Sequence, residues 1–126
     1  MDQLNKPTLF LATTDAARAR QFYEKVLGFR CLGDQPWALR FQIGDSVLNI
    51  QKVQEVINGH YTQLGWLVED IARTVAALSE RGVTFEKYPQ MPQDEQGIMT
   101  MPGQARVAWF KDPDGNTLSL TQVLSQ

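Results

Sequence analysis

Apolar side chains recur at helical spacing in two stretches of the chain, each preceded by an aspartate and followed by a glycine. The first stretch lies between Asp15 and Gly28 and carries Ala19, Phe22, Tyr23, Val26 and Leu27. The second lies between Asp70 and Gly82 and carries Ile71, Val75 and Leu78. Aspartate is a favoured N-cap and glycine a favoured C-terminal cap. The pattern therefore predicts two helices, each with one apolar face.

Short runs rich in strand-forming residues surround both helices. They are residues 8–12, 30–33, 37–43 and 46–52 around the first helix, and 63–68, 83–85, 105–111 and 117–124 around the second. A βαβββ unit is thus expected twice, over about residues 6–53 and 61–124. The predicted fold class is α+β, with two βαβββ modules forming a curved half-barrel sheet around a central cleft and the helices outside. We expect residues 1–126 to form a single domain of this kind.

The dipeptide Gly44-Asp45 predicts a two-residue hairpin turn that pairs Ile43 with Ser46. Counting outward from that pair gives an apolar face with Leu39, Phe41, Leu48 and Ile50. The opposite, polar face carries Arg40, Gln42, Asn49 and Gln51, and it suits either solvent or a ligand site. Similar counting in the last two strands predicts that Phe110 shares a face with Ser119. The same alternation predicts Trp66 and Trp109 on a packing face, and Trp37 is also expected in the core.

Composition and charge exclude several function classes. The net charge of -2 offers no electrostatic footprint for a nucleic acid, and no apolar run is long enough to span a membrane. The chain starts without a signal-like segment, so a cytoplasmic location is expected. A single cysteine, Cys31, and a single histidine, His60, argue against most zinc and iron sites. The proline-containing stretch 87–104 is predicted to be irregular, as either a lid over a site or a surface loop.

Three stretches together resemble the vicinal oxygen chelate superfamily, which includes glyoxalase I, the extradiol dioxygenases, fosfomycin-modifying enzymes and the bleomycin-resistance proteins. The stretches are Asp15-Ala-Ala-Arg-Ala-Arg-Gln-Phe-Tyr-Glu-Lys-Val-Leu-Gly28-Phe29, then Val68-Glu-Asp70 before the second helix, and Ala108-Trp-Phe-Lys-Asp-Pro-Asp-Gly-Asn116. The resemblance spans nearly the whole chain and implies the paired-module fold. It also implies a homodimer, because members of the family often build the cleft from two chains.

The resemblance implies where a metal would be held, because its metalloenzymes bind one divalent ion with side chains from four strands, typically His and Glu. The corresponding positions in this chain are Thr8, Asn49, Gln63 and Ser119. Neutral amide and hydroxyl oxygens are weak ligands for a divalent transition metal. No metal and no other cofactor is therefore expected. His60 lies three residues before Gln63, where a loop histidine is more often incidental than a ligand.

These observations favour a metal-free protein that holds a small, partly aromatic molecule, similar to the bleomycin-resistance proteins. The predicted ligand-binding residues are Thr8, Arg40, Gln42, Asn49, Gln63, Phe110 and Ser119. The alternative is a glyoxalase I-like lyase or isomerase, or another metal-dependent enzyme of the superfamily such as a dioxygenase. Metal-free acid–base catalysis, for which Glu69, Glu86, Asp94 and Glu95 are available, and a purely structural role are further readings. The expected partners are a small molecule and a second copy of the chain, without nucleic acid or membrane.

Overall fold

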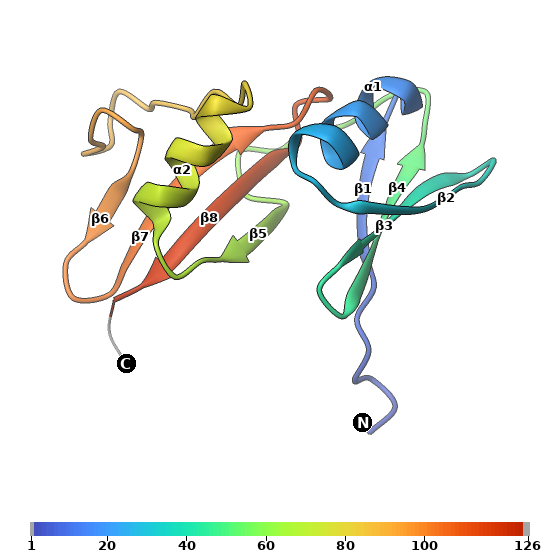
Figure 1. The fold of residues 1–126 in the computed structure, drawn as a ribbon, viewed down its shortest axis with the longest axis horizontal. Helices are drawn as coiled ribbons and strands as arrows, with labels where there is room; N and C mark the ends of the chain where they lie inside the picture. The colour runs from blue at the N-terminus through green and yellow to red at the C-terminus, as the bar shows by residue number, and fades with distance from the viewer. Residues whose placement is uncertain (1, 125–126) are drawn as a thin grey trace. The chain divides into compact units, whose positions relative to one another are not determined.

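The structure is a computed structural model that describes residues 2–124. The chain divides into two compact units, Met1–Ile57 and Asn58–Gln126. Each unit contains one four-stranded sheet and one helical segment (Figure 1). No helix within residues 2–124 has the length and apolar character needed to cross a membrane.

The first unit contains one helical segment between its first and second strands. Its elements are β1 (Leu9–Thr13), α1 (Ala16–Arg20), the π-helical η1 (Gln21–Val26), β2 (Arg30–Asp34), β3 (Ala38–Ile43) and β4 (Ser46–Lys52). The strand order is β1-β4-β3-β2, with β1 parallel to β4 and the other pairs antiparallel. The helical segment begins where the Asp15 carboxylate accepts a hydrogen bond from the Arg18 amide, at 3.1 Å. It ends before Gly28, whose φ of 82° is readily adopted only by glycine.

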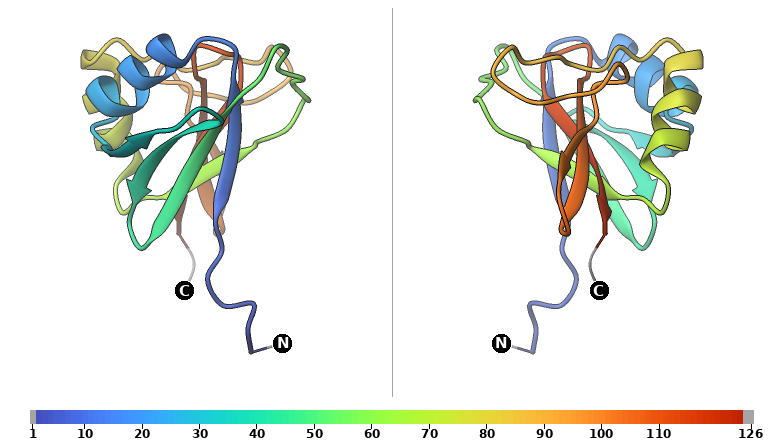
Figure 2. Two further views of the ribbon diagram at one scale, coloured as in Figure 1. Left: turned by 90° about the vertical axis from the view of Figure 1, so that its right-hand side faces the viewer. Right: turned by 90° about the vertical axis from the view of Figure 1, so that its left-hand side faces the viewer.

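The second unit repeats this arrangement. Its elements are β5 (Leu64–Leu67), α2 (Ile71–Glu80), β6 (Met99–Met101), β7 (Ala105–Lys111) and β8 (Thr117–Val123). The strand order β5-β8-β7-β6 is again first, fourth, third, second, with one parallel pair. The carboxylate of Asp70 caps α2 at the Arg73 amide, and α2 covers one face of the sheet (Figure 2). The predicted α+β class and the two βαβββ modules are confirmed.

The hairpin register predicted for the first unit is also confirmed. Ile43 pairs with Ser46 across Gly44, which adopts a positive φ of 56°. The four residues predicted for the apolar face are fully buried: Leu39, Phe41, Leu48 and Ile50. The Tyr23 ring of η1 lies 5.8 Å from the Phe41 ring, so the helical segment packs on this face. The opposite face of the sheet, here called the open face of the first sheet, is therefore the polar one.

The strand expected at residues 83–85 does not form, and this prediction is wrong. Only a single bridge, Phe85 with Phe110, joins this segment to β7. The chain then leaves the sheet. The Gln93 side chain accepts a hydrogen bond from the Tyr88 amide and donates to the carbonyls of Glu86 and Gly97, so these backbone groups are not available to a neighbouring strand. The edge of the sheet is formed instead by β6, within the stretch expected to be irregular. A side chain that satisfies backbone hydrogen bonds competes with strand formation.

Candidate functional site

The second sheet has a face that points away from α2, here called the open face of the second sheet. The face toward α2 is identified by Gln122, whose Oε1 accepts a hydrogen bond from the Ile71 amide at 2.9 Å. Pairing between β7 and β8 places Trp109 opposite Ser119 and Lys111 opposite Thr117. Since neighbours along a strand alternate between faces, these four residues belong to the open face.

The prediction that Phe110 shares a face with Ser119 is wrong. Phe110 pairs with Leu118 and is 1% exposed, on the face toward α2. Its ring lies 5.3 Å from Phe85 and 6.4 Å from Trp66. The residues of β7 and β8 pair one for one from Lys111–Thr117 onward, so the sequence-based count was displaced by one residue. A displacement of one residue exchanges the two faces of a strand.

The three tryptophans, all predicted to lie in the core, have different environments. Trp66 stacks over the buried Phe110 ring and belongs to the packed face, as predicted. Trp37 is 52% exposed, so its prediction is wrong. Trp109 is half-buried on the open face, so its prediction is also wrong. The one-residue displacement had assigned it to the packed face.

A cavity of about 500 Å³ lies within the second unit, beside the open face of its sheet. It is open to solvent on one side and is lined by one loop before β5, one loop after the Phe85 bridge, and the adjoining ends of β7 and β8. The lining residues are Gly59, His60, Tyr61, Thr62, Tyr88, Gln90, Met91, Trp109, Lys111 and Thr117. Three segments that are far apart in the sequence thus form one concave surface.

Aromatic rings and hydroxyl groups dominate this cavity. The rings of Tyr88 and Trp109 meet edge to face with centroids 5.7 Å apart, and the Trp109 indole Nε1 donates a hydrogen bond to Thr62 Oγ1 at 3.2 Å. Burial, and then the nearby charge of Glu86, raises the pKa of Tyr88. The Tyr88 phenol therefore stays protonated at neutral pH and can donate a hydrogen bond. Of these cavity residues, Tyr88, Gln90 and Met91 lie in the stretch 87–104 that the sequence predicts to be a lid or a surface loop, and His60 was considered only as an improbable metal ligand.

The predicted site residues of the first unit lie on the open face of the first sheet. The Asn49 amide Nδ2 donates to Thr8 Oγ1 at 2.8 Å and to the Leu9 carbonyl at 3.1 Å. Arg40 lies opposite Asn49 in the β3–β4 register. Gln42 is engaged locally, because its Nε2 donates to the carbonyls of Gly44 and Ser46 in the hairpin. The structure thus groups Thr8, Arg40 and Asn49, while Gln42 stabilises its own turn.

The predicted residues of the second unit lie at the β5–β8 pair. Gln63 donates through Nε2 to Asn116 Oδ1 at 3.1 Å and accepts from the Thr117 amide at 2.8 Å. Ser119 is buried beside Gly65, where an added β-carbon would lie 2.5 Å from Ser119 Oγ. Glycine at position 65 therefore leaves space for the serine hydroxyl on the open face.

The side chains at the four family metal positions do not fit a divalent transition metal. All four are neutral, and Asn49 and Gln63 are already engaged in hydrogen bonds within their own units. Across the described stretch 2–124, no three or more His, Cys, Asp or Glu side chains gather as metal ligands. Such metals select imidazole, thiolate and carboxylate ligands. We therefore derive no chemistry through a metal at these positions.

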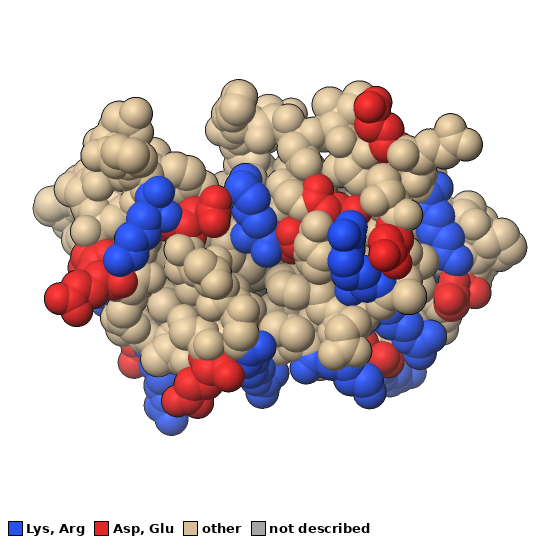
Figure 3. Space-filling model, turned by 90° about the horizontal axis from the view of Figure 1, so that it is seen from above, with Lys and Arg blue, Asp and Glu red and all other residues tan. Residues whose placement is uncertain are grey.

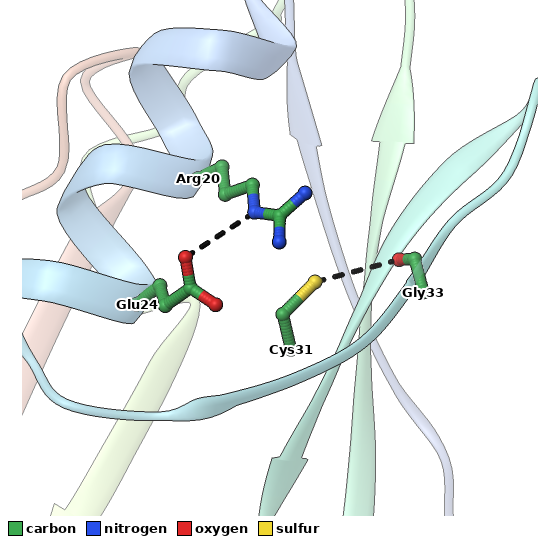
Figure 4. Close-up of polar contacts among 4 residues, drawn as sticks. All are labelled: Arg20, Glu24, Cys31 and Gly33. Atoms are coloured by element: carbon green, nitrogen blue, oxygen red, sulfur yellow. Dashed lines mark hydrogen bonds and ion pairs between the residues drawn. The ribbon is translucent and has the colours of Figure 1, made fainter.

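The only cysteine lies outside the cavity, in the first unit. Cys31 Sγ is 3.7 Å from the Gly33 carbonyl, and the nearby Arg20 and Glu24 side chains form an ion pair at 3.3 Å (Figure 4). The hydrogen bond that Arg20 donates to the Glu24 carboxylate, and then an electrostatic contribution from Cys31, raise the pKa of Arg20. The Cys31 thiol is therefore not among the groups that line the cavity.

Charged side chains of both signs are interspersed on the surface. Lysine and arginine alternate with aspartate and glutamate on the face shown in Figure 3. A nucleic-acid-binding surface gathers one sign of charge along a stripe or patch. The face shown therefore has no such stripe.

Comparison with known proteins agrees with the paired-module fold. The family model described as the Glyoxalase/Bleomycin resistance protein/Dioxygenase superfamily matches residues 4–120. No curated protein matches the chain. Among solved structures, a glyoxalase family protein from Enterococcus faecalis is 22% identical with a TM-score of 0.73, over 96% of this chain and 99% of that one. TnmS3, an antibiotic binding protein from Streptomyces sp. CB03234, is 26% identical with a TM-score of 0.64, over 95% of this chain and 98% of that one.

Proposed function

The chain belongs to the Glyoxalase/Bleomycin resistance protein/Dioxygenase superfamily, and from this premise we propose that it is a metal-free protein that binds a small, partly aromatic molecule. The observation that carries the proposal is the cavity of about 500 Å³ beside Trp109. Its volume falls within the range of about 300–1,000 Å³ that is usual for small-molecule sites.

The cavity lining supports an aromatic ligand. Trp109, Tyr88 and Tyr61 offer ring surfaces, and Met91 adds an adaptable apolar contact. Hydroxyl and amide groups between them can orient the polar part of a ligand. The likeness to TnmS3, which is described as an antibiotic binding protein, favours the same kind of role for this chain.

Binding is favoured over metal-dependent catalysis by the chemistry of the available side chains. The four family metal positions carry Thr8, Asn49, Gln63 and Ser119, whose neutral oxygens bind divalent transition metals weakly. None of the seven residues predicted from the sequence lines this cavity. Five of them remain proposed ligand contacts on the open faces of their own sheets, apart from the cavity: Thr8, Arg40, Asn49, Gln63 and Ser119. Gln42 and Phe110 are less suited, because one stabilises a turn and the other is buried.

We expect flat aromatic compounds to change the tryptophan fluorescence of the purified protein, because Trp109 lines the cavity. A panel of aromatic and glycopeptide-like compounds should include binders that saturate in a fluorescence titration. The variant Trp37→Phe is the matched control, since Trp37 lies in the first unit and its removal should leave the response intact. A panel in which no compound binds, by fluorescence and by calorimetry, would contradict the proposal.

Metal reconstitution tests the metal-free part of the proposal separately. Protein stripped with a chelator and reloaded with nickel or zinc should retain no stoichiometric metal after gel filtration. Stoichiometric metal together with hemithioacetal isomerase activity would instead support the glyoxalase I-like alternative.

We keep the cytoplasm as the expected location of the protein.

We further propose that the protein is a homodimer. Large apolar side chains are exposed in both units, including Phe10 at 52% and Leu67 at 78%. Exposed apolar side chains of this size are favourable in a protein–protein interface. Light scattering at micromolar concentration should give twice the mass of 14.3 kDa, and a monomer mass would contradict the proposal.

A further inference from the structure

Among the described residues, the lining of the second-unit cavity includes one lysine and no acidic side chain. Lys111 is the cation, and the residues in the described range 2–124 that line the cavity include no aspartate or glutamate. The Lys111 ammonium lies 3.0 Å from the Thr117 hydroxyl, which also lines the cavity. An ammonium beside a hydroxyl presents two hydrogen-bond donors to an incoming anion, since the hydroxyl can also donate.

The carboxylate closest in sequence to this cation, that of Asp112, is held elsewhere. Asp112 is buried in its own turn, where its Oδ1 accepts from the amides of Asp114 and Asn116 and its Oδ2 from the Asn116 side chain. Its charge is therefore satisfied by three N–H donors. The lysine ammonium is a compact cation with three hydrogen-bond donors. It is available to an anionic ligand when no carboxylate is already paired with it.

An anion is disfavoured beside Tyr88. Glu86 lies close enough to Tyr88 for its charge to raise the pKa of the phenol. A negative group on a ligand would be repelled beside Tyr88 and attracted beside Lys111. The aromatic pair of Tyr88 and Trp109 belongs to the same lining as Lys111. The lining thus combines an aromatic pair with one cationic group suited to an anion.

We propose that the ligand of this cavity is an aromatic carboxylate, whose anionic oxygens are bound by Lys111 and Thr117 while its ring packs against Trp109. This inference rests on the proposed function and specifies its ligand class. Charge-assisted hydrogen bonds are stronger than neutral ones. Because Lys111 is exposed, salt should weaken the interaction by screening.

A matched pair of ligands tests this inference: a naphthoate and the corresponding neutral naphthamide, which share the ring system and differ in charge. Calorimetry on the full chain should show the naphthoate binding about tenfold more tightly than the naphthamide. The preference should decrease as sodium chloride is raised. Lys111→Gln should abolish the preference, whereas Lys111→Arg should retain it. Arg73→Gln, which removes the same charge from α2 outside the cavity lining, is the control and should leave the preference unchanged.

The outcomes separate this inference from the function on which it rests. If both compounds bind equally to the unmodified protein, the anion preference is overturned while binding of aromatic molecules stands. If Lys111→Gln folds normally by circular dichroism and keeps the preference, Lys111 is not the recognising group. If neither compound binds, the proposed binding of aromatic molecules fails for this class, and the inference fails with it.

Discussion

Replacing Phe110 by alanine is expected to lower the free energy of unfolding by about 3–5 kcal/mol. The Phe110 ring is 1% exposed and contacts the rings of Trp66 and Phe85. Its removal leaves a cavity in the packed face of the second sheet, because α2 and the strands cannot fully collapse into the space. Urea unfolding followed by circular dichroism measures this loss.

The conservative variant Phe110→Leu retains most of the apolar volume and is the control for this substitution. It should cost clearly less than alanine, since volume-conserving exchanges in cores are tolerated best. Equal and small losses for both variants would contradict the assignment of Phe110 to the core and would favour the register first expected from the sequence.

Replacing Trp109 by alanine is expected to weaken naphthoate binding by roughly 10- to 100-fold, because a ring at the centre of a binding surface carries much of the binding energy. Trp109 is half-buried, lines the cavity, and contacts Tyr88 at a centroid distance of 5.7 Å. Calorimetry is the appropriate measurement, because the substitution removes the tryptophan that lines the cavity and would report binding by its fluorescence.

The variant Trp109→Phe keeps an aromatic surface while removing the indole hydrogen bond to Thr62. It should retain most of the affinity if ring packing dominates binding. Unchanged affinity in Trp109→Ala, with normal folding, would show that the ligand does not bind against this ring. The pair of positions 109 and 110 is therefore diagnostic: one substitution should act mainly on binding and the other mainly on stability.

Local signals in the sequence predicted much of each unit correctly. Each helical segment begins at an aspartate whose side chain accepts a backbone hydrogen bond, namely Asp15 or Asp70. Each ends before a glycine with a positive φ, namely Gly28 or Gly82. The Gly44-Asp45 turn fixed the register of β3 and β4, because a two-residue loop leaves one way to pair the strands. These features depend on neighbouring residues and are therefore readable without tertiary information.

Features that depend on distant contacts were predicted less well. The five-residue turn 112–116 does not reveal the pairing of β7 and β8 as a two-residue turn does, so Trp109 and Phe110 were assigned to the wrong faces. The edge strand β6 replaces residues 83–85 because the Gln93 side chain binds the intervening backbone. The cavity joins three segments that no periodicity links, so its lining was largely missed.

The hydrogen-bond chain around Gln63 also bears on how such a protein could change its chemistry during evolution. Gln63 donates to Asn116, and Asn116 donates in turn to the buried Asp112 carboxylate at 2.8 Å. A glutamate at position 63 could still accept from Thr117, but it would place its charge against the Asn116 oxygen. The Asn116 amide cannot reverse its orientation without losing Asp112. Introducing an acidic metal ligand at this position would therefore require coordinated substitutions at positions 63 and 116, so a single substitution to glutamate would be unfavourable.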